Sequence, residues 1–191
     1  MLLKPLAAIG VIFALSLVDQ AQTAGPTFTT VGPGQTAAAL GLTSKQEQAI
    51  ADELESDPDG DWDHSRLAQL RYSRVALTST PKEDAIVVTS RAPEDCGGTG
   101  NCAYWILRVK GEQIQLLLAA FGDEVGIQER SNNGLRNVVV VGHLSADADS
   151  LVMYAFDGET YQPSECYERT GGVAGKLTSF SSKSCDSHAS D

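Results

Sequence analysis

The pattern of apolar and polar positions predicts β-strands over most of the chain after residue 69. Short runs rich in Val, Ile, Leu and aromatic residues recur there, separated by Gly, Asn and Asp, which favour turns. Sequential runs joined by tight turns indicate antiparallel strands, because parallel βαβ units need a helix in each connection. The strands predicted by this pattern are Leu70–Leu77, Ala85–Ser90, Cys102–Val109, Gln113–Ala119, Glu124–Gln128, Val138–Leu144, Leu151–Phe156 and Thr160–Tyr167.

Two of these strands are apolar on both faces. The run 151–156 has large apolar side chains at odd and even positions, and residues 138–141 are all valine. A strand of this kind is covered on both sides, in a sandwich, a curled sheet or a sheet capped by a helix. Residues 113–116 alternate instead, which predicts a strand that is partly exposed. We therefore predict a mainly β (α+β) fold, an antiparallel meander sheet or sandwich with a short N-terminal helix.

Three tight turns are predicted between the strands, at Lys110-Gly111, at Asn132-Asn133-Gly134 and at Asp157-Gly158. An Asp-Gly pair between two strand-like runs favours a type I′ hairpin, because both central residues of that turn need positive φ. We expect this turn type at Asp157-Gly158.

A helix is predicted to begin near Ser44. Ser44 and Glu47 have the spacing of a capping box, Leu42 offers an apolar contact before it, and the helix should end before Pro58. The apolar stripe is thin, so we expect the helix to pack on an edge of the sheet. Its members are Ala49, Ile50 and Leu54.

The N-terminus has the pattern of an export signal. Lys4 precedes the apolar run Pro5–Val18, which is shorter than the roughly 20 residues that span a bilayer. Cleavage after Ala21 or Ala24 is expected, and an uncleaved N-terminal anchor is the alternative. We predict a signal peptide at 1–24, a flexible spacer at 25–41, one β-rich domain at 42–170 and a Ser/Gly-rich tail at 171–191 tied by Cys185. The expected location is secreted or periplasmic.

The charge balance narrows the classes of partner. The chain has 14 basic and 25 acidic residues, a net charge of −11. Nucleic-acid phosphates and anionic lipid would repel such a chain, so we expect no nucleic-acid binding and no membrane insertion after signal cleavage. Basic proteins or cations are the partners that this charge favours, although it also serves solubility alone.

The four cysteines predict two disulfides. Cys96, Cys102, Cys166 and Cys185 all lie in the exported part, where an even number of cysteines indicates crosslinks. Three connectivities are possible. We predict Cys96–Cys102 and Cys166–Cys185, because the glycines between the first two permit a tight return. A zinc site is the alternative, but no C-x-x-C pair is present.

The segment Cys96-Gly97-Gly98-Thr99-Gly100-Asn101-Cys102 continues into an aromatic strand, and Phe156-Asp157-Gly158-Glu159-Thr160-Tyr161 precedes Cys166. In these elements the chain resembles an uncharacterised family of small secreted bacterial proteins with a C-G-x-x-G-N-C loop and a closing F-x-G-x-x-Y…C element. The resemblance covers about half of the chain. It implies export and the fold, and it implies no activity. The acidic calcium-like loop of many members is replaced here by residues 76–81.

One group of carboxylates has spacing suited to a metal. Asp57, Asp59, Asp61 and Asp63 alternate along a turn, and Ca²⁺ prefers such oxygen ligands. Trp62 stands where an EF-hand needs Gly, and Ala68 where it needs Glu. Ca²⁺ is the one cofactor that the sequence suggests, and a solvated acidic turn is the alternative.

No catalytic motif is found. Three histidines, His64, His143 and His188, would have to serve any triad, and no nucleophile elbow or H-E-x-x-H motif is present. The leading hypothesis is an exported, non-enzymatic binding module for an unknown protein, such as a basic envelope protein or cell-wall enzyme. A hydrolase without a local motif and a structural or accessory subunit of an envelope assembly are the alternatives. The predicted binding surface is the crosslinked loop, with Glu94, Asp95, Thr99 and Asn101; a staple that holds a strand end is its alternative role.

Overall fold

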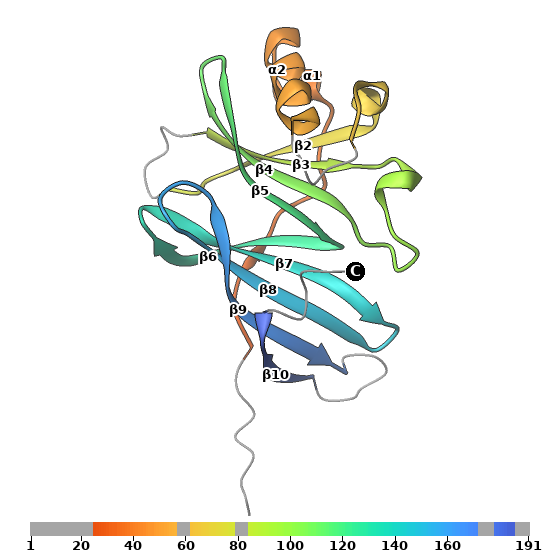
Figure 1. Ribbon diagram of the computed structural model, residues 1–191, viewed down its shortest axis with the longest axis vertical. Helices are drawn as coiled ribbons and strands as arrows, with labels where there is room; N and C mark the ends of the chain where they lie inside the picture. The colour runs from red at the N-terminus through yellow and green to blue at the C-terminus, as the bar shows by residue number, and fades with distance from the viewer. Residues whose placement is uncertain (1–24, 57–61, 79–83, 172–177, 186–191) are drawn as a thin grey trace, which may run out of the picture.

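The strands form two antiparallel sheets in the computed structural model, which describes residues 25–56, 62–78, 84–171 and 178–185 (Figure 1). The four-stranded sheet has the order β2-β3-β4-β5 and the six-stranded sheet the order β1-β6-β7-β8-β9-β10. Within each sheet, apart from β1, strands that follow one another in sequence are neighbours in space, so the chain completes one meander before it starts the next. The predicted β-rich fold with a short helix is confirmed.

The strands have the following bounds: β1 Thr29–Thr30, β2 Leu70–Val75, β3 Asp84–Ser90, β4 Cys102–Lys110, β5 Gln113–Gly122, β6 Glu124–Asn132, β7 Leu135–Ser145, β8 Ala148–Phe156, β9 Tyr161–Thr170 and β10 Ser179–Lys183. The helices are α1 (Ala37–Leu40), α2 (Ser44–Glu55) and the 3₁₀ helices η1 (His64–Gln69) and η2 (Pro93–Asp95). All eight predicted strands are present in the described chain. No helix within the described ranges is long and apolar enough to cross a membrane.

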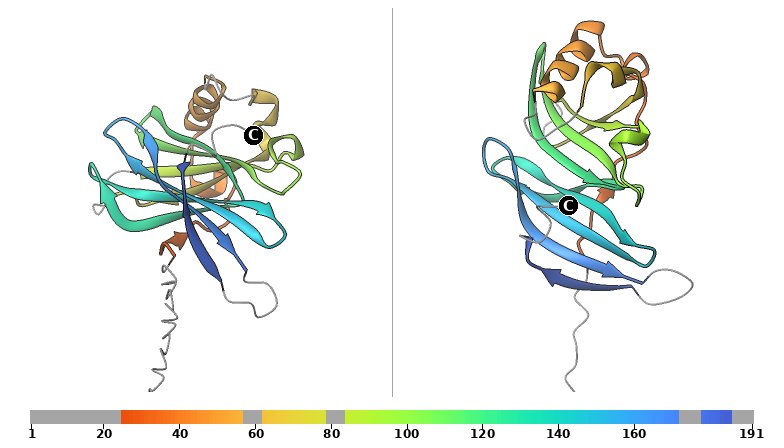
Figure 2. Two further views of the ribbon diagram at one scale, coloured as in Figure 1. Left: turned by 60° about the horizontal axis from the view of Figure 1, so that its bottom comes forward. Right: turned by 45° about the vertical axis from the view of Figure 1, so that its right-hand side comes forward.

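The two sheets stack as layers, with the helices on the far side of the four-stranded sheet (Figure 2). Val138 and Val140 point into the core between the sheets, while Val139 and Val141 point to the outer face of the six-stranded sheet. The prediction that these strands are covered on both sides is confirmed. The core between the sheets consists of Leu77, Ala85, Val87, Ile106, Leu117, Leu118, Val125, Leu135, Val138, Val140, Phe156 and Tyr161.

Helix α2 covers a face of the four-stranded sheet. Ile50, Ala51 and Leu54 are buried in one cluster with residues of β2, β3 and β4, so the helix lies over the face of the sheet as well as against its edge strand β5, where packing was expected. The face is available because β4 presents large apolar side chains there as well as toward the other sheet. The Glu53 carboxylate also reaches the edge strand β5, where it accepts a hydrogen bond from the Leu116 amide at 2.8 Å.

The capping box of α2 lies one residue earlier than predicted. The Thr43 hydroxyl accepts from the Gln46 amide at 3.2 Å, and the Gln46 side chain accepts from the Thr43 amide at 3.1 Å. Thr and Gln satisfy the same two backbone donors as Ser and Glu would. The helix ends at Glu55, before Pro58 as expected.

The type I′ turn lies at Asn133-Gly134 and not at Asp157-Gly158. Asn133 and Gly134 have φ of 46° and 87°, as this turn requires. At the other site the Asp157 side chain accepts from the amides of Glu159 and Thr160, at 2.8 and 2.9 Å. These bonds favour a longer four-residue connection, from 157 to 160, over a two-residue turn.

Residues 25–41, expected to be a flexible spacer, form part of the fold. β1 pairs with β6, and Gln35 then exchanges two backbone hydrogen bonds with Tyr72 of β2, at 2.8 and 2.9 Å. The segment therefore runs from the edge of one sheet to the edge of the other. Backbone pairing at sheet edges leaves no hydrophobic period in the sequence, which is why the segment looked like a spacer.

The expected loose tail also contributes a strand. β10 pairs with β9 along five residues, and a disulfide links Cys166 of β9 to Cys185, two residues beyond β10. Both predicted disulfides, Cys96–Cys102 and Cys166–Cys185, are present. Residues 172–177 and 186–191 of the predicted tail, and the predicted signal at 1–24, lie outside the described residues.

Candidate functional site

The start of β4, the end of β5 and the end of β7 meet at one corner of the molecule, which we call the disulfide corner. Cys102 pairs with Gly122, and the chain crosses from one sheet to the other through Asp123. A Cβ on Gly122 would lie 2.6 Å from both Val140 and the Val141 carbonyl, so only glycine permits this approach of β5 to β7. The sequence thus brings the crosslinked loop against the six-stranded sheet.

The loop 96–102 is a closed turn in addition to a disulfide. The Gly97 amide donates to the Asn101 carbonyl at 2.7 Å, and the Gly100 amide donates to the Gly97 carbonyl at 2.9 Å. Gly100 has a φ of 85°, which L side chains adopt at a cost. The glycines between the cysteines permit this return, as predicted.

Asn101 fastens the loop to β7. Its side-chain amide donates to the His143 carbonyl at 3.0 Å, and its side-chain carbonyl accepts from the His143 amide at 2.8 Å. One side chain thereby satisfies both backbone groups of His143, as a strand neighbour would. Asn101 therefore connects the beginning of β4 to the other sheet, and it is only partly exposed.

The His143 ring lies between two carboxylates. Its Nδ1 is 2.6 Å from Asp149 on β8, and its Nε2 is 3.3 Å from Asp123. The pKa of His143 is raised above 6.5, chiefly by the hydrogen bond to Asp149 and also by the charge of Asp123. The ring is 42% exposed and borders a hollow of about 410 Å³.

Arg169 of β9 lies beside Asp149, on the side away from His143, and the three residues form a row across the sheet. Its Nε and Nη2 donate to the second oxygen of Asp149 at 2.9 and 2.7 Å. His143, Asp149 and Arg169 are direct cross-strand partners, so the register of the sheet places them side by side. The pKa of Asp149 lies below its usual range because its bonds to Arg169 and His143 outweigh the effect of burial.

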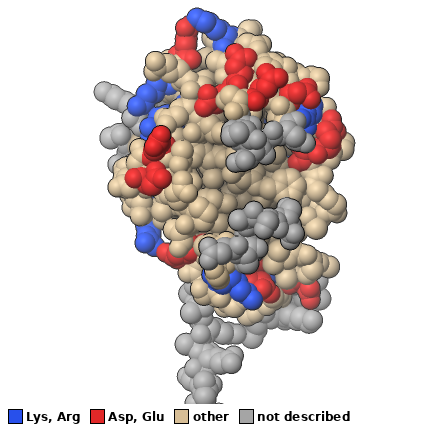
Figure 3. All heavy atoms as spheres, in the orientation of Figure 1, with Lys and Arg blue, Asp and Glu red and all other residues tan. Residues whose placement is uncertain are grey.

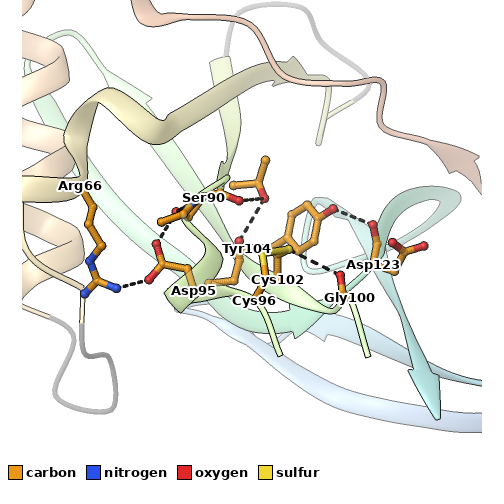
Figure 4. Close-up of a disulfide and its surroundings, with 11 residues drawn as sticks. Arg66, Ser90, Asp95, Cys96, Gly100, Cys102, Tyr104 and Asp123 are labelled. Atoms are coloured by element: carbon orange, nitrogen blue, oxygen red, sulfur yellow. Dashed lines mark hydrogen bonds and ion pairs between the residues drawn. A yellow bond between two sulfur atoms is a disulfide. The ribbon is translucent and has the colours of Figure 1, made fainter. Parts of the chain in front are cut away.

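Tyr104 and Asp123 border a second hollow, of about 270 Å³, beneath the N-terminal segment. The Tyr104 hydroxyl donates to the Asp123 carbonyl at 2.7 Å, as Figure 4 shows. Burial raises the pKa of Tyr104 above 10. Three shifted titratable groups therefore gather around one corner, a property typical of functional sites and also of structural ion-pair networks.

Asp95 does not belong to the exposed surface of the loop. Its side chain is 2% exposed, forms an ion pair with Arg66 of η1 and accepts a hydrogen bond from the Ser90 hydroxyl (Figure 4). The single turn of η2 directs this carboxylate inward, whereas Glu94 beside it is exposed. The predicted binding surface therefore needs correction at Asp95.

The other predicted binding residues differ in exposure. Thr99 is exposed at the tip of the loop, while Asn101 is occupied by its bonds to β7. Sequence reasoning missed Phe121, whose side chain is 53% exposed and lies against Gly97 of the loop. Its partner across the ladder is Ala103, but a register shift between Ile106 and Leu107 separates this pair from the hairpin turn, so the sequence pattern carried no signal that placed it there.

The predicted calcium ligands are mostly outside the described residues. Asp57, Asp59 and Asp61 are not described; Asp63 is, and it caps η1 by accepting from the Ser65 amide at 2.7 Å. Hydrogen bonds from the side chain and the amide of Ser65 lower the pKa of Asp63. Within the described ranges, no group of three or more His, Cys, Asp and Glu residues is arranged to hold a metal ion.

The other histidines lie away from the disulfide corner or outside the description. His64 contacts Asp52 and Glu55 of α2, at 3.1 and 2.9 Å. His188 is not among the described residues. In the described chain, no hydroxyl or thiol is hydrogen-bonded to the His143 ring, so its neighbours are carboxylates and not a nucleophile.

Comparison with known proteins gives no match to any family model, curated protein or solved structure.

Proposed function

We propose that this protein is an exported, non-enzymatic binding module that recognises a basic protein, such as a basic envelope protein or cell-wall enzyme, through the disulfide corner. The observation that carries the proposal is the exposed ring of Phe121 against the crosslinked loop. Among the described residues, Phe121 and Leu144 are the large apolar side chains that remain exposed. Leu144 follows His143, to which the loop is bonded through Asn101.

The loop has two properties that favour recognition. It is held by a disulfide, by its own backbone bonds and by Asn101, so little conformational freedom is lost when a partner docks on it. An exposed aromatic ring beside a rigid loop is the kind of anchor that contributes most to protein interfaces.

The charge of the surface favours a basic partner. Glu94 precedes the loop and is exposed, and the Asp123 side chain is 47% exposed at the corner. Figure 3 shows more acidic than basic side chains on the face in view, consistent with the net charge of −11. Complementary charge of this kind raises the rate of encounter more than the final affinity.

The two disulfides support export, because such crosslinks persist in oxidising compartments. The apolar run behind Lys4 supports it independently. Mass spectrometry of the secreted product tests this part: it should lack 21 to 24 N-terminal residues, and a full-length product retained in the cytoplasm would contradict export.

Site-specific photo-crosslinking in the producing cells tests the recognition surface. A benzoyl-phenylalanine at Thr99 reports the loop, and one at exposed Gln113 reports the opposite end of β5. We expect a crosslinked protein from position 99, its absence at position 113, and its loss when Phe121→Ser is added. Equal products from both positions, or a product that survives Phe121→Ser, would contradict this surface. If the crosslinked product always contains this protein and its partner in one fixed ratio, the hypothesis of a structural or accessory subunit would be favoured.

A further inference from the structure

We infer that His143 is a pH-responsive latch of the disulfide corner: its imidazolium holds the β5–β6 connection against the β7–β8 hairpin, and loss of one proton releases that connection. The positions of two carboxylates around the His143 ring support this inference. The ring bridges Asp149, on β8, and Asp123, the single residue between β5 and β6.

The number of donors on the ring decides the state of the latch. An imidazolium has two N–H donors: Nδ1–H donates to Asp149, and the charge on the Nε2 side forms an ion pair with Asp123. Neutral imidazole has one donor, and it stays on Nδ1, since Asp149 lies closer, at 2.6 Å, than Asp123, at 3.3 Å. Nε2 then presents a lone pair to the Asp123 carboxylate, and an attraction becomes a repulsion.

The groups around the ring favour the protonated state. Asp149 of β8, Asp123 of the β5–β6 connection, Arg169 of β9 and Asp147 of the adjoining turn are the charged groups that face or border it, and the Phe180 ring of β10 lines the same hollow. Three carboxylates thus oppose one guanidinium, which Asp149 already holds at 2.7 Å.

The direction of the shift fixes the pH range. The folded-state pKa of His143 is raised above 6.5, with Asp149 as the largest cause and Asp123 as a further one. A raised histidine pKa means that the contact is fully present below about 6.5 and is lost as pH rises through the folded-state pKa.

The release is local. Asn101 keeps both of its bonds to the His143 backbone, and the Asp123 amide donates to the Val141 carbonyl at 2.7 Å; none of these groups titrates in this range. Deprotonation therefore loosens the side chain of Asp123 and lets the connection open more often, while the sheets stay packed. Residues 121–123, which include exposed Phe121, are the segment affected.

Histidine NMR titration tests the latch in the full chain. The signal of His143 is assigned by its loss in His143→Gln. We expect His143 to titrate above 6.5, the excess to be reduced in Asp123→Asn and lost in Asp149→Asn, and no change in Glu129→Gln. Glu129 is an exposed carboxylate on β6, and its replacement changes the net charge equally. A titration at or below 6.5 would overturn the inference.

Amide exchange tests the mechanical consequence. The protection factor of the Asp123 amide, corrected for the intrinsic effect of pH, should fall through the titration in the wild type and stay at the low level in His143→Gln. Asp123→Asn is the second variant for this measurement, because its side chain is exposed. Asp149→Asn is less suitable, since it also removes a partner of Arg169. Identical protection profiles in wild type and His143→Gln would show a titrating but mechanically silent histidine and refute the latch.

Discussion

Two adjacent carboxylates, Glu94 and Asp95, have opposite environments although the sequence does not distinguish them. Glu94 is exposed, and Asp95 is buried against Arg66 and Ser90. A charge buried with its partner contributes little net stability, but it becomes costly as soon as the partner is removed. Asp95 therefore fixes η1 and η2 beneath the disulfide corner, and it does not attract a ligand.

Asp95→Ala should destabilise the protein by up to about 3–5 kcal/mol, because buried Arg66 would lose its buried carboxylate partner and keep the more exposed Asp63, at 3.7 Å. Urea denaturation at pH 7 measures this. The double variant Arg66→Met, Asp95→Leu should recover most of the loss, since it removes both charges and keeps apolar volume. A double variant as unstable as the single one would mean that the packing of these side chains, and not the loss of the buried ion pair, is what matters.

The row His143–Asp149–Arg169 shows how far residue patterns reach. A hairpin centred between the predicted strands 138–144 and 151–156 would pair residue 143 with residue 152, whereas the sheet pairs it with 149. The sequence pattern therefore placed both residues near one hairpin but did not bring them together. Arg169 and Asp123 were not predictable either, because their positions depend on β9 and on the crossing between sheets, which no local pattern encodes.

At the scale of elements, alternation identified every strand that has an apolar face. It missed β1 and β10, which are short and mostly polar and are held by backbone pairing and, for β10, by a disulfide beyond its end. It also left open where one sheet ends and the next begins. That division occurs at Asp123, a single residue, because Gly122 lets β5 pass close to β7.

The Asn133-Gly134 turn makes a test of hairpin chemistry. Gly134→Ala should cost about 1–2 kcal/mol, the penalty for an L residue in a left-handed conformation, because φ is 87° and no atom lies near a new Cβ. Gly98→Ala is the matched control, since a Cβ there also meets open space and no positive φ is required. Thermal denaturation of both variants should separate them; equal stability would mean that the turn adapts its backbone.

The whole molecule is closed by its two crosslinks at different places. Cys96–Cys102 constrains the disulfide corner, and Cys166–Cys185 fastens the edge strand β10 to β9 of the six-stranded sheet. In the chain-entropy model the contribution grows with the separation, which is 6 residues in the first case and 19 in the second.

Replacing Cys166 and Cys185 together with Ser should lower the free energy of unfolding by about 3 kcal/mol, and replacing Cys96 and Cys102 by about 2 kcal/mol. Denaturant titrations of the two double variants measure the difference. Replacing Cys96 and Cys102 should also weaken the hydrogen bonds between Asn101 and His143, which would be visible as faster exchange of the His143 amide. A larger loss from the short loop than from the long one would show that native contacts of the loop outweigh chain entropy.

The net charge of the whole molecule and the local charge of the disulfide corner make different predictions for association with the partner captured at position 99. If the corner steers the encounter, Glu94→Lys should slow association, and rising salt should do the same, because the Debye length falls from about 10 Å at 0.1 M to about 3 Å at 1 M. Glu112→Lys is the matched control: it lies in the β4–β5 turn, is exposed, and like Glu94→Lys changes the net charge from −11 to −9. Stopped-flow rates for both variants at low salt separate the two origins. Slower association in Glu94→Lys alone places recognition at the corner, whereas equal slowing would assign it to the overall field and remove the loop from the proposed surface.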